Sequence, residues 1–349
     1  MCRIHIDIYR YLFKGVGCSY FMRKSKEFQK LVVKMREKGF YTPQVQRSID
    51  WSAYTLNQIN DLVDTLKFVR TNVDKVHESR ENNSVGRPAT DAGDLAKAIL
   101  FVEMVGIPER KAEGWLVLIG HHLGIENKID DRVLGKAYQN REVISILEKV
   151  FENNKTSDGK MGGDGTGLEG SRKENYESTK KKTNYLTSIV DSREIVQQFD
   201  LGNKQECQAM HDLVSRLKIE FKKEISILTT NAKLALDAGF VDRKLIQLIE
   251  DSGMIPFVFP KKNNVITPRG YPAWGRMCKK IVDEVQNWLK EYHIRSHTES
   301  FHSSLKRVFG IVTKRLNITV YTQILARIIH NNRRKTNYHQ LKQTNTTTN

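Results

Sequence analysis

From residue 184 onward, short apolar runs typical of strands alternate with longer amphipathic stretches typical of helices. Strands are predicted at residues 184–190, 194–199, 234–236 and 254–259, and helices at 207–224, 242–251 and 277 to about 305. The periodicity of the apolar residues separates the two kinds of element. Because strands interleaved with helices pack as a sheet covered by helices, we expect an α/β domain over residues 153–338.

The chain before residue 153 has helical patterns without strands. Helices are expected between residues 26 and 73, and again over residues 91–104, 109–123 and 130–151. A polar linker that ends in Gly86-Arg87-Pro88 separates the two groups, which we treat as helical regions 1–85 and 86–152. The second region is either a helix-turn-helix that binds DNA or a plain three-helix packing unit. The polar tail 339–349 is expected to be disordered.

Basic residues are concentrated near the end of the chain. The 349 residues include 57 Lys+Arg and 40 Asp+Glu, a net charge of +17, and residues 261–335 alone carry +12 of it. Such a region attracts a polyanion, most often nucleic acid, and the binding should depend on salt. The sequence has no apolar run that suits a membrane span and no signal-peptide pattern, so a cytoplasmic protein without a membrane partner is expected. The four widely spaced cysteines indicate a reduced chain without a zinc knuckle.

Two aspartates stand out by their local context. Asp164 lies in Gly162-Gly163-Asp164-Gly165-Thr166-Gly167, where glycines let backbone, substrate or metal approach the carboxylate closely. The alternative is a surface loop with an incidental acid. Asp237 follows the 234–236 strand, and open α/β sheets place functional groups at the carboxyl ends of strands. The alternative is a helix cap; Asp242 is the better candidate for that cap, and it is the reserve ligand should Asp237 be the cap.

A carboxylate, two cations and a phenol recur at helical spacing in the last predicted helix. These residues are Tyr292, Arg295, Glu299 and Lys306. On a continuous helix their offsets fall within an arc of roughly 60°, so all four would share one face. A metal-binding acid between phosphate-binding cations suits phosphodiester chemistry. The alternative is a solvated charged face, and an interruption near His293–Ser296 would break the alignment.

These motifs resemble those of the DDE-class transposases of insertion sequences. The matching segments are Asp164-Gly165-Thr166-Gly167, Asp237-Ala238-Gly239-Phe240-Val241-Asp242, and the cut-and-paste signature Tyr292-x2-Arg295-x3-Glu299-x6-Lys306. The resemblance covers residues 155–335. It implies a ribonuclease-H-like mixed sheet flanked by helices, preceded by an all-α N-terminal region. Only 61 residues separate the second acid from the third, so the β-insertion that many relatives carry there is absent.

The resemblance also implies an activity and a site. The implied site comprises the catalytic metal ligands Asp164, Asp237 and Glu299 and the phosphate- or DNA-binding residues Tyr292, Arg295 and Lys306. The cofactor would be two Mg²⁺ (or Mn²⁺) ions. The enzyme would cut the ends of an insertion sequence and join the freed 3′-hydroxyls to target DNA, acting as a homodimer on double-stranded DNA in the nucleoid. Two other classes stay open: a DNA-binding protein without catalysis, either a regulator or a decayed element, and a ribonuclease-H-like nuclease or resolvase that cuts without joining.

Overall fold

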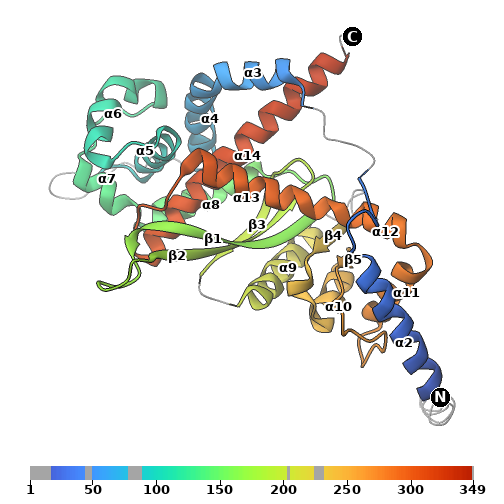
Figure 1. Ribbon diagram of the computed structural model, residues 1–349. Helices are drawn as coiled ribbons and strands as arrows, with labels where there is room; N and C mark the ends of the chain where they lie inside the picture. The colour runs from blue at the N-terminus through green and yellow to red at the C-terminus, as the bar shows by residue number, and fades with distance from the viewer. Residues whose placement is uncertain (1–16, 44–48, 78–88, 203–204, 224–231, 348–349) are drawn as a thin grey trace, which may run out of the picture. The chain divides into compact units, whose positions relative to one another are not determined.

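The computed structural model describes residues 17–43, 49–77, 89–202, 205–223 and 232–347 (Figure 1). The chain divides into two compact units. The first unit comprises Met1–Gln46, Gly159–Asp164 and Lys204–Ser296, and the second comprises Arg47–Asp158, Gly165–Asn203 and His297–Asn349. The domain boundaries expected at residues 85, 152 and 338 stay predictions. The Gly86-Arg87-Pro88 linker lies outside the described residues.

A mixed five-stranded sheet has the strand order β3-β2-β1-β4-β5. The strands are β1 (Lys160–Lys173), β2 (Lys181–Asp191), β3 (Val196–Leu201), β4 (Lys233–Leu236) and β5 (Ile255–Val258). In the first unit, β4 pairs in parallel with both β1 and β5. In the second unit, β2 and β3 form the antiparallel hairpin that the sequence predicts. Pro256 is tolerated in β5 because β5 is an edge strand, where one ladder hydrogen bond can be missing.

The first unit has several helices beside its three parallel strands. They are α2 (Gly17–Lys34), α9 (Glu206–Lys223), η1 (Ala238–Phe240), α10 (Arg243–Asp251), α11 (Pro272–Asp283), α12 (Val285–Tyr292) and η2 (His293–Arg295). Helix α10 contacts β5, and α12 contacts both β4 and β5. The buried core of this unit includes Met161, Leu236, Phe257 and Trp288. These contacts help to fix β4, which Asp237 directly follows. Strand β1 pairs with β4 through residues 160–163, directly before Asp164.

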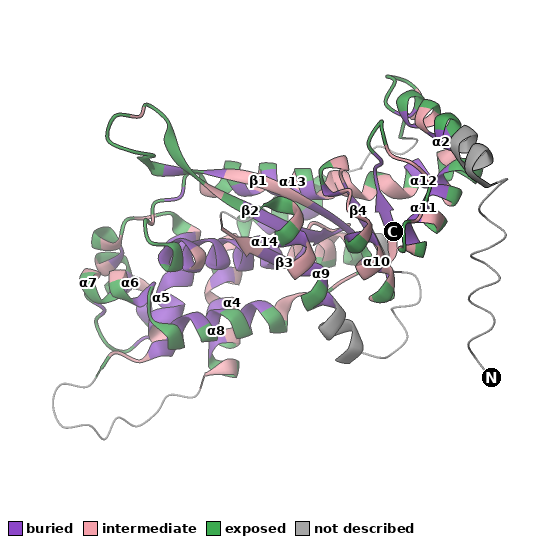
Figure 2. Ribbon diagram, turned by 90° about the horizontal axis from the view of Figure 1, so that it is seen from below, coloured by how far each residue is buried: buried purple, intermediate pink, exposed green. Residues whose placement is uncertain are grey.

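The other helices of the described residues lie wholly or almost wholly in the second unit. They are α3 (Trp51–Ile59), α4 (Asp61–Val76), α5 (Ala92–Val105), α6 (Glu109–Leu123), α7 (Asp131–Ala137), α8 (Arg141–Asn154), α13 (Ser296–Phe309) and α14 (Asn317–Thr347). Helix α5 is buried along most of its length (Figure 2), between α4, α7, α8 and α14. The single helix expected over residues 130–151 is two helices, because Asn140 caps a new one by accepting from Glu142 N at 2.8 Å.

The expectation of a disordered tail after Tyr338 is wrong, because α14 continues to Thr347. Contacts with α3 hold the polar end of this helix. Asp50 N donates to Tyr338 Oη at 3.1 Å, and Asn345 Nδ2 lies 3.5 Å from Asp50 Oδ2. A buried apolar stretch nearer the start of α14 gives the helix a stable base, so the polar residues extend a helix that already exists. No described helix is both long and apolar enough to cross a membrane.

Candidate active site

Asp164 lies within strand β1, directly after three buried residues. The sequence Met161-Gly162-Gly163 is a poor strand former, yet it pairs residue by residue with β4. A Cβ atom on Gly163 would lie 2.6 Å from Leu236 Cδ2 and 2.8 Å from Met210 Cε. Glycine is therefore what lets β1 approach its neighbours closely at this position. The carboxylate that follows is held on a strand that is paired and packed.

The register of β1 and β4 places Asp164 next to Asp237. The last printed pair of the parallel ladder joins Gly163 to Leu236, and the next residue in each chain segment is an aspartate. Neighbouring strands lie about 4.8 Å apart, and residues at the same level of a parallel ladder point to the same side. Two carboxylates from segments 73 positions apart in the sequence thus start from adjacent backbone positions.

The two alternatives for Asp237 and Asp242 are separated by their hydrogen bonds. Asp242 is the N-cap of α10, since Lys244 N donates to Asp242 Oδ1 at 3.0 Å, and this confirms the predicted cap. Asp237 precedes η1 without a side-chain capping bond. Its half-buried carboxylate is therefore not used as a helix cap, which is the alternative that competed with ligand function.

Tyr292 and Arg295 differ in their surroundings. Arg295 Nη1 donates to Asp164 Oδ2 at 3.2 Å, so this predicted cation meets a predicted carboxylate inside the first unit. The Tyr292 ring stacks on Trp288, with centroids 5.2 Å apart and planes 8° from parallel, and it also contacts Phe259. The ring of Tyr292 is thus packed in an aromatic cluster of the first unit.

The helix predicted to carry all four signature residues is not continuous. Helix α12 ends at Tyr292, the 3₁₀ turn η2 contains Arg295, and α13 begins at Ser296. Because a 3₁₀ turn advances by three residues per turn rather than 3.6, the arc computed for one regular helix does not apply. The interruption noted near residues 293–296 is confirmed.

Glu299 and Lys306 lie on α13 in the second unit. Both side chains are exposed, and Lys306 Nζ donates to Thr166 Oγ1 at 2.6 Å. On the buried side of the same helix, His302 Nε2 lies 2.9 Å from Ser188 Oγ on β2. Burial, assisted by the positive charge of Lys306, lowers the pKa of His302 to about 3. His302 is thus a neutral internal contact that anchors α13 to β2.

Basic side chains line a cavity of about 900 Å³ in the second unit. Its cationic lining residues are Arg172, Lys173, Lys182, Lys314 and Arg315. Gly170, which lies farther along the strand that carries Asp164, also lines the cavity. The adjoining backbone is held by a hydrogen bond in which Ser171 N donates to Val312 O at 2.8 Å. A concave surface with this charge attracts phosphate groups.

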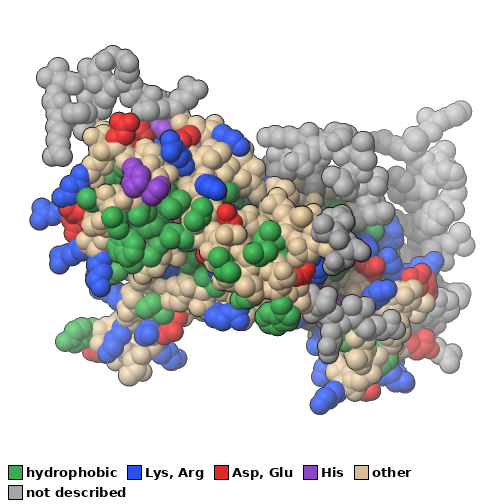
Figure 3. All heavy atoms as spheres, turned by 90° about the horizontal axis from the view of Figure 1, so that it is seen from above, with side chains coloured by type: hydrophobic (Ala, Val, Ile, Leu, Met, Phe, Trp, Pro, Cys, Tyr) green, Lys and Arg blue, Asp and Glu red, His purple; other side chains and the backbone are tan. Residues whose placement is uncertain are grey.

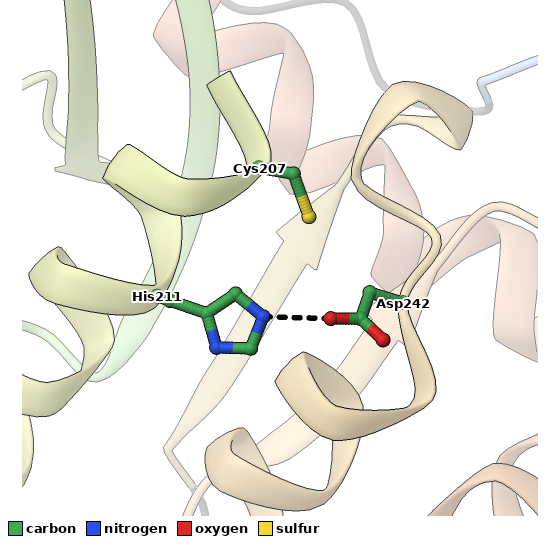
Figure 4. A group of neighbouring side chains, drawn as sticks. All are labelled: Cys207, His211 and Asp242. Carbon is green, nitrogen blue, oxygen red and sulfur yellow. Dashed lines mark hydrogen bonds and ion pairs between the residues drawn. The ribbon is translucent and has the colours of Figure 1, made fainter. Parts of the chain in front are cut away.

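Among the described residues, two groups of three potential metal ligands have ligand atoms within 4.8 Å of one another. They are Cys207, His211 and Asp242 in the first unit (Figure 4), and Glu113, Asp130 and Asp131 in the second. The three predicted catalytic carboxylates are not among these groups. Sequence reasoning missed the first group, although a cysteine and a histidine four residues apart on a predicted helix are a readable signal. Burial and the Asp242 carboxylate raise the pKa of Cys207, which disfavours a nucleophilic thiolate.

Part of the chain is similar to known proteins. Residues 160–329 match the family model described as the transposase DDE domain. This span contains all five strands and the three predicted acids, and the mixed sheet with flanking helices is consistent with the expected ribonuclease-H-like fold. The chain is also 28% identical over 235 residues to the probable transposase for insertion sequence element ISA1214 of Archaeoglobus fulgidus, a match that covers 65% of this chain and 69% of that protein. No solved structure matches the chain.

Proposed function

We propose that this protein is a DNA transposase that cuts the ends of an insertion sequence and joins them to target DNA. The observation that carries the proposal is the β1–β4 register, which gives Asp164 and Asp237 adjacent backbone positions. The match to the transposase DDE domain spans both residues. Two carboxylates, one on a strand and one directly after the neighbouring strand, are suited to hold divalent cations at a phosphodiester.

Glu299 is the third carboxylate of the proposed site. Its place is supported by two contacts, each inside its own unit: Arg295 with Asp164, and Lys306 with Thr166. Thr166 lies two residues after Asp164 on β1, and Glu299 lies between the two cations on the η2–α13 segment. These two contacts flank Glu299 in the sequence, one on each side. Glu299 is included in the site because it lies between Arg295 and Lys306 in the sequence.

The residues fit the divalent ions that the domain family implies. The donor set consists of carboxylate oxygens, which Mg²⁺ and Mn²⁺ prefer, and the Asp237 carboxylate makes no helix-capping hydrogen bond. Asp164, Asp237 and Glu299 would hold two ions. When bound, the ions would lower the pKa of the attacking water and neutralise charge on the phosphate. Because Arg295 contacts Asp164 Oδ2, its positive charge competes with a cation for that carboxylate.

The reaction has two displacements at phosphorus. A water oxygen attacks a phosphodiester at the element's end, and the departing 3′-oxygen takes up a proton to become a 3′-hydroxyl. That hydroxyl then attacks a phosphodiester of the target, so that one new phosphodiester forms and a target 3′-hydroxyl leaves. Arg295, once released from Asp164, and Lys306 bind phosphate oxygens. Tyr292 positions one phosphate while its ring stays packed on Trp288.

DNA binding is assigned to the basic surfaces. The cavity beside Lys314 and Arg315 continues from the strand that carries the first acid, and residues 261–335 carry most of the excess charge. Neutralising several backbone phosphates there would release counterions and make binding fall steeply with salt. We assign double-stranded DNA, both element end and target, as the partner of this surface. The helix pair α5–α6 is a candidate for sequence-specific binding to the DNA at the ends of the element.

A second copy of the chain is the other proposed partner. Helix α6 exposes Trp115, Val117 and Leu118 by 44%, 66% and 67%. Figure 3 shows hydrophobic side chains gathered on part of the molecular surface. Contiguous apolar surface of this kind commonly marks an interface. Leu118→Glu should lower the dimer fraction in sedimentation on DNA, whereas Gln139→Glu, which adds the same charge at another exposed position, should leave it unchanged. Equal dimer fractions for both variants would exclude this face.

The proposal is tested with duplexes that carry the inverted sequences flanking the coding region. Incubation with Mg²⁺ should give 3′-hydroxyl ends at the element boundary, followed by products joined to a target plasmid. DNA binding without any cleavage would favour the non-catalytic DNA-binding protein. Cleavage without joined products would favour the nuclease or resolvase.

A further inference from the structure

Three side chains of different chemistry meet away from the proposed catalytic acids. Cys207 and His211 lie one turn apart on α9, and Asp242 lies at the start of α10 (Figure 4). Their ligand atoms are all within 4.8 Å of one another, and His211 Nε2 lies 2.7 Å from Asp242 Oδ2. All three side chains are half-buried, and all three belong to the first unit.

The geometry is close to what a small divalent ion needs. Zinc binds sulfur at about 2.3 Å and nitrogen or oxygen at about 2.0–2.2 Å, which puts tetrahedral ligand atoms roughly 3.3–3.8 Å apart. In the protein, the His211–Asp242 pair is slightly closer than this, and the remaining separations reach at most 4.8 Å. Side-chain rotations alone can therefore bring the three atoms around one ion.

The donor set selects the class of ion. A thiolate, an imidazole and a carboxylate suit Zn²⁺ and related transition ions, whereas Mg²⁺ prefers oxygen ligands. One thiolate and one carboxylate also cancel the charge of a divalent ion, and a neutral complex is the least costly one to hold in a half-buried place. Asp242 is already oriented for the task, because its Oδ1 accepts from Lys244 N at 3.0 Å and its Oδ2 faces His211. Fixed ligand orientation of this kind raises metal affinity.

We propose that Cys207, His211 and Asp242 bind one Zn²⁺-class ion that joins α9 to the start of α10. A water molecule would complete the tetrahedral coordination. Asp242 follows Asp237 by five residues, and between them lie only η1 and Val241. The ion would hold one end of this short connection while the β-sheet holds the other at Leu236. Its role is therefore structural: it restrains the segment that presents Asp237 and takes no part in the strand-cutting reaction.

The test uses the full-length chain, stripped of metal with a chelator and kept in excess Mg²⁺ so that oxygen-only sites are filled. Titration with Co²⁺ should produce a thiolate-to-cobalt charge-transfer band that saturates at one ion per chain and disappears when Zn²⁺ is added. Zn²⁺ should also raise the unfolding temperature, because an ion that binds only the folded chain stabilises it. Absence of the band, or saturation at no defined stoichiometry, would overturn the proposal.

Matched variants locate the ion. Cys207→Ser should abolish the band, and His211→Gln should weaken Co²⁺ binding by at least about tenfold, the cost of losing even an outer-shell partner. Asp242→Asn should also weaken it, and since Asn caps helices as well as Asp does, α10 is retained. Cys278→Ala is the thiol control, because Cys278 is the other described free cysteine, and it should keep the band. A band that survives Cys207→Ser would contradict the assignment.

The experiment also separates this ion from the catalytic ones. Asp164→Asn changes a proposed catalytic ligand and should leave the thiolate band unaltered. Loss of the band in that variant would show that the two sites are one and would overturn the structural role. Failure to find DNA cleavage, in contrast, would bear on the proposed function and leave the zinc-site result standing.

Discussion

Arg295 Nη1 lies 3.2 Å from Asp164 Oδ2, so a predicted phosphate-binding cation is paired with a predicted metal ligand. Both side chains are about four-fifths buried, at 20% and 22% exposure. Partial burial strengthens the pair relative to one on the open surface. The pair keeps the carboxylate charge-compensated before a cation binds, and it opposes cation binding for the same reason.

Arg295→Gln should therefore have two opposite effects. The Mn²⁺ concentration for half-saturation should fall several-fold, because Asp164 no longer has to leave a cationic partner. Cleavage at saturating metal should fall about tenfold or more, because a charged contact to phosphate is lost. Metal titration by electron paramagnetic resonance and a cleavage assay measure the two. Lys290→Gln removes an exposed charge from α12 and is the control; equal behaviour of both variants would contradict a direct role for Arg295.

Lys306→Gln should weaken DNA binding and reduce its salt dependence. Lys306 reaches β1 through Thr166, which places its charge beside the proposed phosphate path. One lost phosphate contact should lower the slope of log affinity against log salt by about one. Fluorescence anisotropy over a salt series measures that slope. Arg307→Gln, the neighbouring exposed cation, should change the slope less, and a reversed order would remove Lys306 from the DNA surface.

His302 should make the second unit sensitive to acid. The folded-state pKa is lowered to about 3, below the ordinary value of 6.5. The unfolded chain therefore binds the extra proton first, and the free energy of unfolding falls as pH drops from about 6.5 toward 3. At about pH 5 this single group should cost roughly 2 kcal/mol. His302→Gln should flatten the pH dependence by that amount in urea unfolding at neutral pH and at about pH 5, and an unchanged profile would refute the assignment.

Gly163→Ala tests the close approach of β1 to its neighbours. The added methyl would meet Leu236 Cδ2 at 2.6 Å and Met210 Cε at 2.8 Å, so the unfolding free energy should fall by about 1–3 kcal/mol. Gly239→Ala, where the new Cβ would meet no atom within 4 Å, should change it by less than about 0.5 kcal/mol. Thermal and urea unfolding of the two variants gives the comparison. Equal stabilities would mean that β1 can shift freely.

Local rules explain why some elements could be predicted from the sequence. Asp242 is a preferred capping residue placed directly before an apolar periodic stretch, and it caps α10. The 191–193 turn and its two strands follow equally local patterns. Strand β1 could not be read in this way, because Met161-Gly162-Gly163 has little strand propensity and is a strand only through pairing with β4. The end of α14 likewise depends on contacts with α3 from far away in the sequence.

The candidate site also has features that follow from local sequence and features that depend on folding. The contexts of Asp164 and Asp237 were visible in the sequence, but their shared level in the sheet is a property of strand register. The prediction that Tyr292 to Lys306 lie on one face of a continuous helix was wrong, because the 3₁₀ turn η2 interrupts the helix. Cys207 and His211 were readable as a helical pair. Their third partner comes from another segment, 31 positions after His211, and only folding identifies it.

The most direct test of the central claim is cleavage of element-end DNA by Glu299→Gln in Mg²⁺. Loss of a metal-binding carboxylate should lower the cleavage rate by about a thousandfold or more, equivalent to several kcal/mol of transition-state stabilisation, with DNA affinity nearly unchanged. Glu284 is an exposed acid at the N-cap position of α12, and Glu284→Gln should cut like the natural chain. Full cleavage by Glu299→Gln would contradict the proposed three-carboxylate site.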